Sequence, residues 1–292
     1  MLLKTQRSSL SLTNRGAQIL KWRIGNHDLL WNGRGGKWDA IAPLLFPVVG
    51  HINGNEIRIA EDRYPMMLHG FIAGQDFQVK NLYAESVHLS SCSNETSLKF
   101  YPFFFQFDVF YTLYESALES RFIITNTGLE TMPFAFGVHP GFRRPLFGGE
   151  KSDYVFRFEK PESALVPVIT KDGLFRSANR KIENFNGQDL VLSPYIFQNE
   201  ALCFLNTSSR QAVIEHSQYG FLKISTENFS HWALWSYPEA PFLCIENWSG
   251  YGDPENFDGE FAQKPSMRFL EPGQQEIFKV LYEVRYPQSD EI

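Results

Sequence analysis

A histidine in this sequence stands where it could pass a proton to or from a bound molecule. His139 follows the aromatic strand Phe134–Gly137 and precedes Pro140, which favours an extended backbone at His139. The imidazole is therefore held at a strand end and flanked by aromatic rings. Because a histidine can donate or accept a proton near neutral pH, acid–base chemistry is the expected role. The alternative is a histidine that only packs in the core.

A glutamate further along the chain is its expected partner. Glu246 ends the apolar strand Phe242–Glu246, where a carboxylate is costly to bury unless it is paired or used. Trp248 lies two residues on and shares the face of Glu246 in an extended strand. A carboxylate beside an indole suits a sugar, whose hydroxyls need acceptors and whose apolar face stacks on aromatic rings. The alternative is a salt-bridged glutamate at a sheet edge.

Two other histidines precede or follow glycines. His51 follows the proline-bracketed run Pro43–Pro47 and Gly50, and His69 lies in Leu68-His69-Gly70-Phe71. Histidines on such loops can project into a pocket, so both are candidates for binding substrate. A purely structural role stays open for each of them.

Short strand-like segments run along nearly the whole chain, and several alternate apolar and polar residues. Turn-forming pairs such as Asn53-Gly54 and Pro272-Gly273 separate them. The predicted strands are Gln18–Ile24, Phe77–Leu82, Ser86–Ser90, Ser97–Phe100, Phe104–Leu113, Leu118–Thr125, Phe134–Gly137, Val155–Glu159, Ala212–Glu215, Phe221–Thr226, His231–Ser236, Phe242–Glu246 and Glu276–Tyr286.

This pattern predicts an all-β sandwich or barrel, because helical periodicity is scarce and strands are short and regular. There is no βαβ rhythm and no glycine-rich phosphate loop, which disfavours a nucleotide-binding fold. Residues Glu159–Asn199 are less regular and are expected to form an excursion between strands. We expect one domain over residues 1–292.

Composition narrows the class of protein. A net charge of −6 with scattered basic residues disfavours partners such as nucleic acid or an anionic membrane surface. No segment approaches the roughly 18 apolar residues of a membrane helix, and the N-terminus does not read as a signal peptide. The cysteines, Cys92, Cys203 and Cys244, are too few and too far apart for a disulfide framework or a zinc site. We therefore expect a cytoplasmic protein.

The order of several motifs resembles the aldose 1-epimerase (galactose mutarotase-like) superfamily, and within it the divergent bacterial LacX-type branch. The resemblance covers the chain from about Gln18 to Tyr286. The motifs that carry it are Ala42-Pro43-Leu44-Leu45-Phe46-Pro47, His69-Gly70-Phe71, Met132-Pro133-Phe134, Gly137-Val138-His139-Pro140-Gly141-Phe142, Ala233-Leu234-Trp235-Ser236 and Ile245-Glu246-Asn247-Trp248-Ser249-Gly250.

The resemblance implies a β-supersandwich of two large, mostly antiparallel sheets that interconverts the α and β anomers of an aldose. It implies that Glu246 is the catalytic base, His139 the catalytic acid and His69 a second, sugar-binding histidine. Two positions depart from the family pattern: Asn53 stands where an arginine is usual, and Ser193 where an aspartate is common.

The expected substrate is a free sugar, and a hexose is the preferred candidate. We expect the protein to bind it without a metal or cofactor, as a monomer or homodimer. Trp248, Phe142 and Phe71 are expected to form the stacking wall, with Asn53 and His51 as further substrate-binding residues. A non-catalytic carbohydrate-binding protein on the same fold is the main alternative. A glycoside hydrolase is disfavoured, since it normally needs two catalytic carboxylates and only Glu246 has a convincing aromatic setting.

Overall fold

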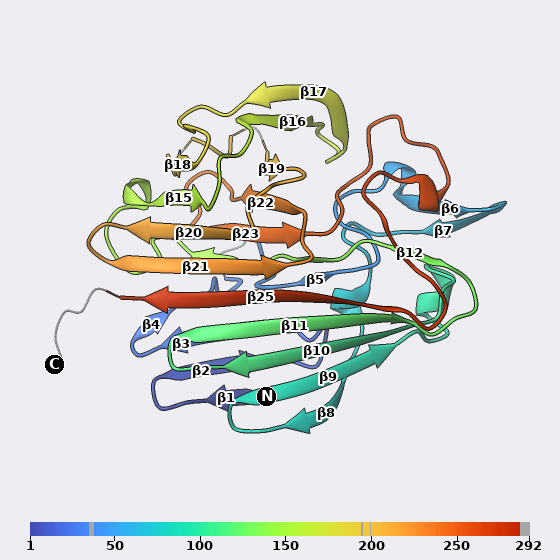
Figure 1. The fold of residues 1–292 in the computed structure, drawn as a ribbon, viewed down its shortest axis with the longest axis horizontal. Coiled ribbons are helices and arrows are strands. Elements are labelled where there is room, and N and C mark those ends of the chain that lie inside the picture. Colours follow the sequence, from blue (N-terminus) through green and yellow to red (C-terminus); the bar gives the residue numbers. More distant parts are fainter. Residues whose placement is uncertain (35–37, 194, 199, 287–292) are drawn as a thin grey trace.

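A nine-stranded antiparallel sheet forms one layer of the molecule (Figure 1). The computed structural model describes residues 1–34, 38–193, 195–198 and 200–286. In spatial order the strands of this sheet are β18 (Asp189–Val191), β15 (Val155–Phe158), β20 (Gln211–His216), β21 (Gly220–Glu227), β25 (Gln275–Arg285), β11 (Ala117–Asn126), β10 (Phe105–Leu113), β9 (Ser86–Cys92) and β8 (Gln78–Leu82).

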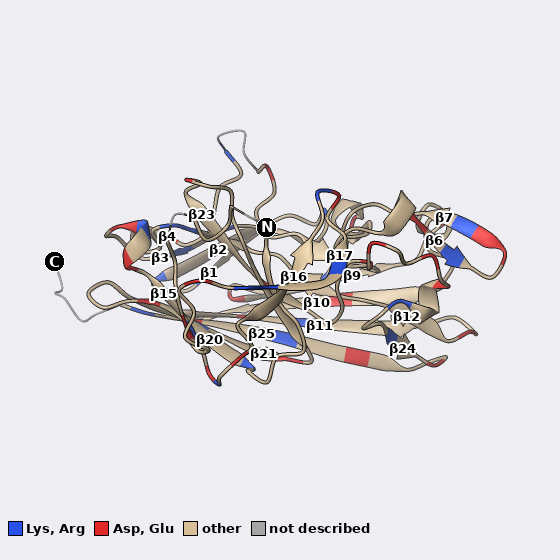
Figure 2. Cartoon of the chain, turned by 90° about the horizontal axis from the view of Figure 1, so that it is seen from above, with Lys and Arg blue, Asp and Glu red and all other residues tan. Residues whose placement is uncertain are grey.

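A six-stranded sheet and a four-stranded sheet belong to the second layer (Figure 2). The six-stranded sheet contains β19 (Leu202–Phe204), β22 (His231–Trp235), β23 (Phe242–Trp248), β13 (Gly137–Val138), β5 (Leu44–Leu45) and β14 (Gly141–Arg143), which also pairs with β23. The four-stranded sheet contains β1 (Leu2–Lys4), β2 (Ser8–Leu12), β3 (Ile19–Ile24) and β4 (His27–Asp28).

Small strand pairs and single turns complete the described chain. The pairs are β12 (Met132–Phe134) with β24 (Arg268–Leu270), β16 (Leu165–Ile169) with β17 (Phe175–Lys181), and β6 (Glu56–Ile59) with β7 (Asp62–Pro65). The 3-10 turns are Asn53–Asn55, Ile72–Gly74, Ser97–Lys99, Lys151–Asp153 and Phe261–Gln263. Within the described residues, no helix is long and apolar enough to cross a membrane.

Aromatic side chains fill the space between the layers. Phe107 of β10 packs edge-on against Phe46 and Phe136, and Phe278 of β25 packs against Phe134 and Phe136. All of these rings are fully buried. Edge-to-face packing of this kind adds to the hydrophobic stabilisation of a core. Buried aromatic side chains thus form much of the contact between the two layers.

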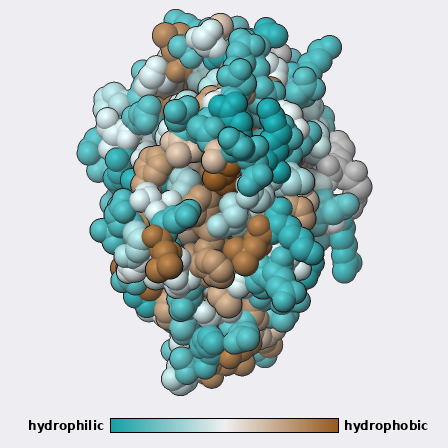
Figure 3. All heavy atoms as spheres, turned by 90° about the vertical axis from the view of Figure 1, so that its right-hand side faces the viewer, coloured by the Kyte–Doolittle hydropathy of each residue, from teal (hydrophilic) through white to brown (hydrophobic). Residues whose placement is uncertain are grey.

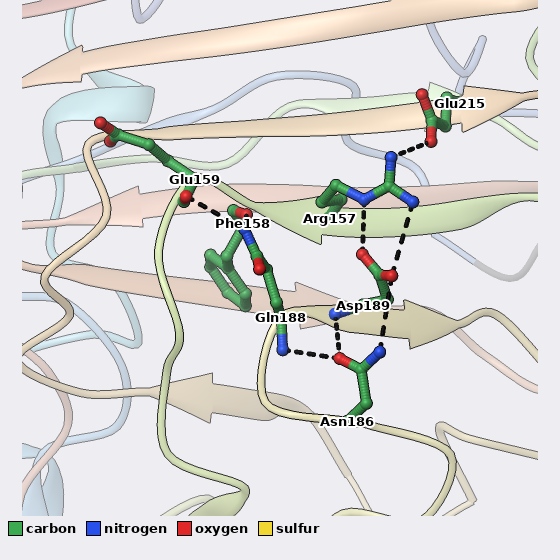
Figure 4. Close-up of polar contacts among 7 residues, drawn as sticks. All are labelled: Arg157, Phe158, Glu159, Asn186, Gln188, Asp189 and Glu215. Carbon is green, nitrogen blue, oxygen red and sulfur yellow. Dashed lines mark hydrogen bonds and ion pairs between the residues drawn. The ribbon is translucent and has the colours of Figure 1, made fainter.

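The outer edge of the nine-stranded sheet is tied by charged side chains (Figure 4). Arg157 of β15 bonds Asp189 of β18 through Nε (2.5 Å) and Glu215 of β20 through Nη1 (2.6 Å). These groups are partly exposed, so each pair adds little stability. Arg157 of the middle strand β15 thus links the edge strand β18 on one side to β20 on the other.

The surface carries charged side chains of both signs and, at one end of the molecule, a group of apolar side chains. Lysine and arginine alternate with aspartate and glutamate over the loops rather than gathering by sign (Figure 2). At the end of the molecule shown in Figure 3, apolar atoms gather within a hydrophilic rim. Phe104 and Leu129, which lie just outside β10 and β11, are exposed.

The all-β, sandwich-like prediction is confirmed, and three local predictions need correction. Ser97–Phe100 is a 3-10 turn rather than a strand. Phe134–Gly137 is split between β12 and β13, which lie in different sheets. The region Glu159–Asn199 is more regular than expected, since it holds the hairpin β16–β17 and the edge strand β18.

Candidate active site

The pairing of β13 with β23 brings His139 and Glu246 together. Gly137 pairs with Trp248 and Val138 with Asn247, so the next step of this antiparallel register sets His139 opposite Glu246. The His139 backbone N–H is held by the carbonyl of Pro43 (3.1 Å). His139 Nε2 lies 3.4 Å from Glu246 Oε1. The sequence places these residues far apart, and the six-stranded sheet makes them neighbours.

Glu246 lies inside β23, whose residues are all buried, rather than at the strand's end as expected. Its carboxylate is 2 % exposed, and its Oε2 accepts a hydrogen bond from Trp248 Nε1 (3.0 Å). Burial raises the pKa of Glu246 well above its ordinary value, and the bond from Trp248 opposes that rise. The carboxyl group therefore has a fixed orientation and a strong affinity for a proton.

His139 is enclosed by aromatic rings. Trp38 stacks on it at 5.0 Å between ring centroids, and the Trp235 ring meets it edge-on at 6.0 Å. Burial, with a smaller contribution from His69, lowers the pKa of His139 well below its ordinary value. Its Nδ1 has no hydrogen-bond partner within the described part of the chain.

These opposed shifts set how many protons the pair carries. A second proton would leave a buried positive charge, and loss of the last proton would leave a buried negative charge. The low dielectric disfavours both states and so favours the state in which His139 and Glu246 share a single proton. One group of the pair can then accept a proton while the other donates one.

His69 presents a neutral N–H donor beside this pair. Its backbone has a φ of 64°, and Gly70 follows it in a turn so close to Phe46 that a Cβ at Gly70 would lie 2.2 Å from the Phe46 carbonyl oxygen. The Gly50 N–H donates to His69 Nδ1 (3.1 Å), which assigns the ring proton to Nε2. Burial lowers the pKa of His69 to about 3, so the ring stays neutral. Its ring centroid lies 5.4 Å from that of His139.

A pocket of about 500 Å³ opens above these three residues. Its described lining includes aromatic side chains from several parts of the chain: Trp38, Phe175, Trp235, Tyr237 and Trp248. Further polar groups in the lining are His51, Cys203 and Glu200. A cavity with aromatic walls and a few convergent polar groups is typical of a small-molecule site.

His51 packs against the turn of the hairpin β16–β17, and this turn forms part of the pocket wall. Its imidazole occupies the space that a Cβ at Gly173 would need, with Cδ2 only 2.1 Å from that position. Burial lowers the pKa of His51, and nearby Asp172 and Glu200 oppose the shift. His51 is thus brought into the same pocket as His69, His139, Glu246 and Trp248.

The remaining predicted site residues lie elsewhere. Phe71 (8 % exposed) packs against Phe46 and Tyr101, and Phe142 (1 % exposed) packs against Tyr282. Neither ring is in the described lining of this pocket, so a stacking role for these two residues stays a prediction from the sequence. Of the predicted stacking wall, Trp248 alone lines the pocket.

The two positions that depart from the family pattern are also outside the described lining. Asn53 lines a neighbouring polar cavity, where its Nδ2 donates to the Phe257 carbonyl (2.9 Å). Ser193 directly follows Leu192, and its N–H donates to the Val191 carbonyl (2.9 Å). The Asn53 side chain therefore anchors a loop, and its contact with substrate stays a prediction from the sequence.

Sequence reasoning missed Trp38 and Trp235 as site residues. Trp235 stands in the motif Ala233-Leu234-Trp235-Ser236 and ends β22, and Trp38 precedes the proline-bracketed run Pro43–Pro47. A tryptophan in or near a recognised motif was the available signal. Among the described residues, no group of three or more histidine, cysteine, aspartate or glutamate side chains is arranged to hold a metal ion.

Comparison with known proteins identifies the family and the fold. The Aldose 1-epimerase family model matches residues 1–267. Protein LacX (plasmid) of Lactococcus lactis subsp. lactis is 30% identical over 255 residues, which cover 84% of this chain and 85% of that protein.

Solved structures share the fold over almost their whole length. A galactose mutarotase related enzyme from Lactobacillus acidophilus is 27% identical with a TM-score of 0.89, covering 100% of this chain and 99% of that one. A galactose mutarotase-like protein from Lactobacillus casei is 24% identical with a TM-score of 0.90, covering 98% and 99%. The family match spans most of the sequence, including the strands that carry His139 and Glu246, and on this ground the chain belongs to the aldose 1-epimerase family.

Proposed function

We propose that this protein is an aldose 1-epimerase, a mutarotase that interconverts the α and β anomers of a free aldose. The observation that carries the proposal is the 3.4 Å approach of His139 Nε2 to Glu246 Oε1 within an aromatic pocket. Ring opening of a cyclic aldose removes a proton from the hydroxyl on C1 and delivers one to the ring oxygen. A pair of groups that holds a single proton is suited to that exchange.

In the proposed mechanism, Glu246 takes the proton from the C1 hydroxyl and His139 protonates the ring oxygen. The C1–O5 bond breaks, the C1–C2 bond rotates, and closure on the other face of the carbonyl reverses both transfers. Each well-placed acid or base contributes roughly 10²–10⁴-fold. The Nε2–H of His69 donates a hydrogen bond to a reacting or neighbouring sugar oxygen.

The pocket walls would hold the sugar for this reaction. Trp38, Trp235 and Trp248 offer apolar faces to the pyranose, and His51 offers a polar group at the rim. We also propose that the activity is cytoplasmic, since Cys92, Cys203 and Cys244 are all free thiols, as is usual in reducing compartments.

A non-catalytic sugar-binding protein is the second candidate. It is favoured by Asn53 and Ser193, which stand where a sugar-binding arginine and aspartate are expected and lie outside the described pocket lining. Such a protein would bind sugar saturably without speeding anomer exchange.

Polarimetry and NMR of freshly dissolved α-anomers separate the two candidates. The panel should contain neutral aldohexoses, aldopentoses and sugar phosphates, each followed with and without protein. We expect at least one free aldose to equilibrate faster in proportion to protein concentration. Saturable binding with an unchanged rate for every sugar would support the binding protein and overturn the enzyme.

A further inference from the structure

A buried ion pair lies outside the pocket and behind its wall. Lys264 Nζ lies 2.8 Å from Asp253 Oδ1, and the two side chains are only 1 % and 3 % exposed. Lys264 also donates to the Tyr251 carbonyl. Neither charged residue is among the described residues that line the pocket. Two charges removed from water in this way need an explanation, because their desolvation is expensive.

Asp253 bonds to two chain segments that form the pocket wall. Its Oδ2 accepts the Asn53 N–H (2.9 Å), and its own N–H donates to the His51 carbonyl (2.9 Å). Its carbonyl accepts the N–H of Phe175 at the start of β17 (2.8 Å). The loop of residues 50–53 and the hairpin β16–β17 are thus held by one residue.

The loop of residues 50–53 in turn holds His69. Gly50 donates its N–H to His69 Nδ1 and accepts the His69 backbone N–H, each at 3.1 Å. On its other side Gly50 packs directly on Gly252, since a Cβ at Gly50 would lie 2.7 Å from the Gly252 Cα. A continuous series of contacts therefore joins the ion pair to the imidazole of His69.

We propose that Asp253 and Lys264 are positioning residues for the active site: through the loop of residues 50–53 they fix the ring orientation and the Nε2–H tautomer of His69. They touch neither the pocket nor its contents. A buried ion pair is weak as a source of stability, and well-packed apolar side chains can often replace it. In this protein the ion pair instead holds the loop of residues 50–53 in a single geometry. The kinetic part of this proposal rests on the proposed function, and the part about the tautomer does not.

The double variant Asp253→Leu/Lys264→Met tests the proposal, since it removes both charges together and leaves no lone buried charge. Long-range ¹H–¹⁵N NMR of the imidazoles reports the His69 tautomer. We expect the wild type to show a single Nε2–H form and the variant to show mixed tautomers. The anomerisation kcat of the variant is expected to fall roughly ten- to a hundredfold, with a smaller change in KM, because a donor is misplaced rather than removed.

Glu260→Gln is the matched control. Glu260 pairs with Arg58 at 2.9 Å in the same part of the molecule, but this pair is about one-third exposed. This variant should keep the wild-type tautomer and rate.

If the double variant does not fold, Asp253→Asn tests the positioning role instead. The amide keeps the shape of the Asp253 side chain and an acceptor for the Asn53 N–H. The same changes are expected at smaller size. A wild-type His69 signal together with a wild-type kcat in the folded variants would overturn the proposal. If the wild type accelerates no sugar, the proposed function fails, and the His69 signal still decides the positioning role.

Discussion

Two strands of this molecule, β11 and β23, bury their side chains in different ways. Every second residue of β11 is buried and the others are partly exposed, as expected for a sheet with one face to the core and one to solvent. All residues of β23 are buried, and Glu246 is among them. The nine-stranded sheet thus provides a hydrophobic face, whereas the central strand β23 of the six-stranded sheet is covered on both sides and carries Glu246.

This difference implies that stability and chemistry can be altered separately. In the nine-stranded sheet, inward residues such as Phe107 contribute packing and no polar group. In the six-stranded sheet, Glu246 and His139 are polar groups kept at a cost in desolvation. Substitutions in the two sheets should therefore change different measured quantities.

The largest effect on kcat in this comparison is expected for His139→Gln. This change removes the group that carries the exchanged proton, so kcat should fall roughly 10²–10⁴-fold. The free energy of unfolding should fall less than in Phe107→Ala, because glutamine keeps a side chain of similar length and His139 Nδ1 has no hydrogen-bond partner to lose within the described residues. Anomerisation rates and urea denaturation measure the two effects. His88→Gln, at the paired histidine on β9, is the control and should keep the wild-type rate.

Phe107→Ala should give the opposite pattern. Removing a fully buried ring that packs between the layers is expected to lower the free energy of unfolding by about 3–5 kcal/mol. The rate per folded molecule should stay at the wild-type value. Phe110→Ala, on the partly exposed outer face of the same strand, should cost only about 1 kcal/mol. Equal costs for Phe107 and Phe110 in urea denaturation would contradict the distinction between the faces.

Trp248→Phe should have a smaller effect on rate. Phenylalanine keeps an aromatic wall but loses the N–H that donates to Glu246 Oε2. Because that bond favours the ionised carboxylate, its loss should raise the pKa of Glu246 further and lower kcat about tenfold at neutral pH. The alkaline limb of the rate profile should move to higher pH. A loss of rate with no movement of that limb would assign Trp248 to stacking alone.

The smallest effect on kcat is expected when the pH is varied near neutrality. Activity needs the pair with one proton. Since burial lowers the pKa of His139, the pair gains its second proton, and activity falls, only below the ordinary histidine range. Since burial raises the pKa of Glu246, the last proton leaves well above the ordinary glutamate range. A kcat profile should be flat between these limits, and a steep change at pH 6–7 would contradict the single-proton pair.

The same contrast explains what the sequence could predict. Strands such as β10 and β11 were recognisable because their alternation of apolar and polar residues is local. Ser97–Phe100 looked equally strand-like, yet it forms a turn, since Ser97 and Asn94 bond each other instead of a neighbouring strand.

The approach of His139 to Glu246 was predictable from residue type and motif, whereas the pocket wall was not. Phe71 and Phe142 lie beside the right motifs, but the direction of each ring depends on packing with distant residues such as Tyr101 and Tyr282. The contact of His51 with Gly173 depends in the same way on a long-range approach of two loops.

The proposed role of Glu246 as the base is tested by comparing wild type with Glu246→Gln for a sugar that the wild type accelerates. Intrinsic tryptophan fluorescence measures sugar binding, and NMR exchange between anomers measures turnover at saturation. We expect the variant to fold and to bind sugar with similar affinity, while its anomer exchange falls roughly 10²–10⁴-fold, as in His139→Gln. Exchange at the wild-type rate in the folded, sugar-bound variant would contradict the assignment of Glu246 as the base.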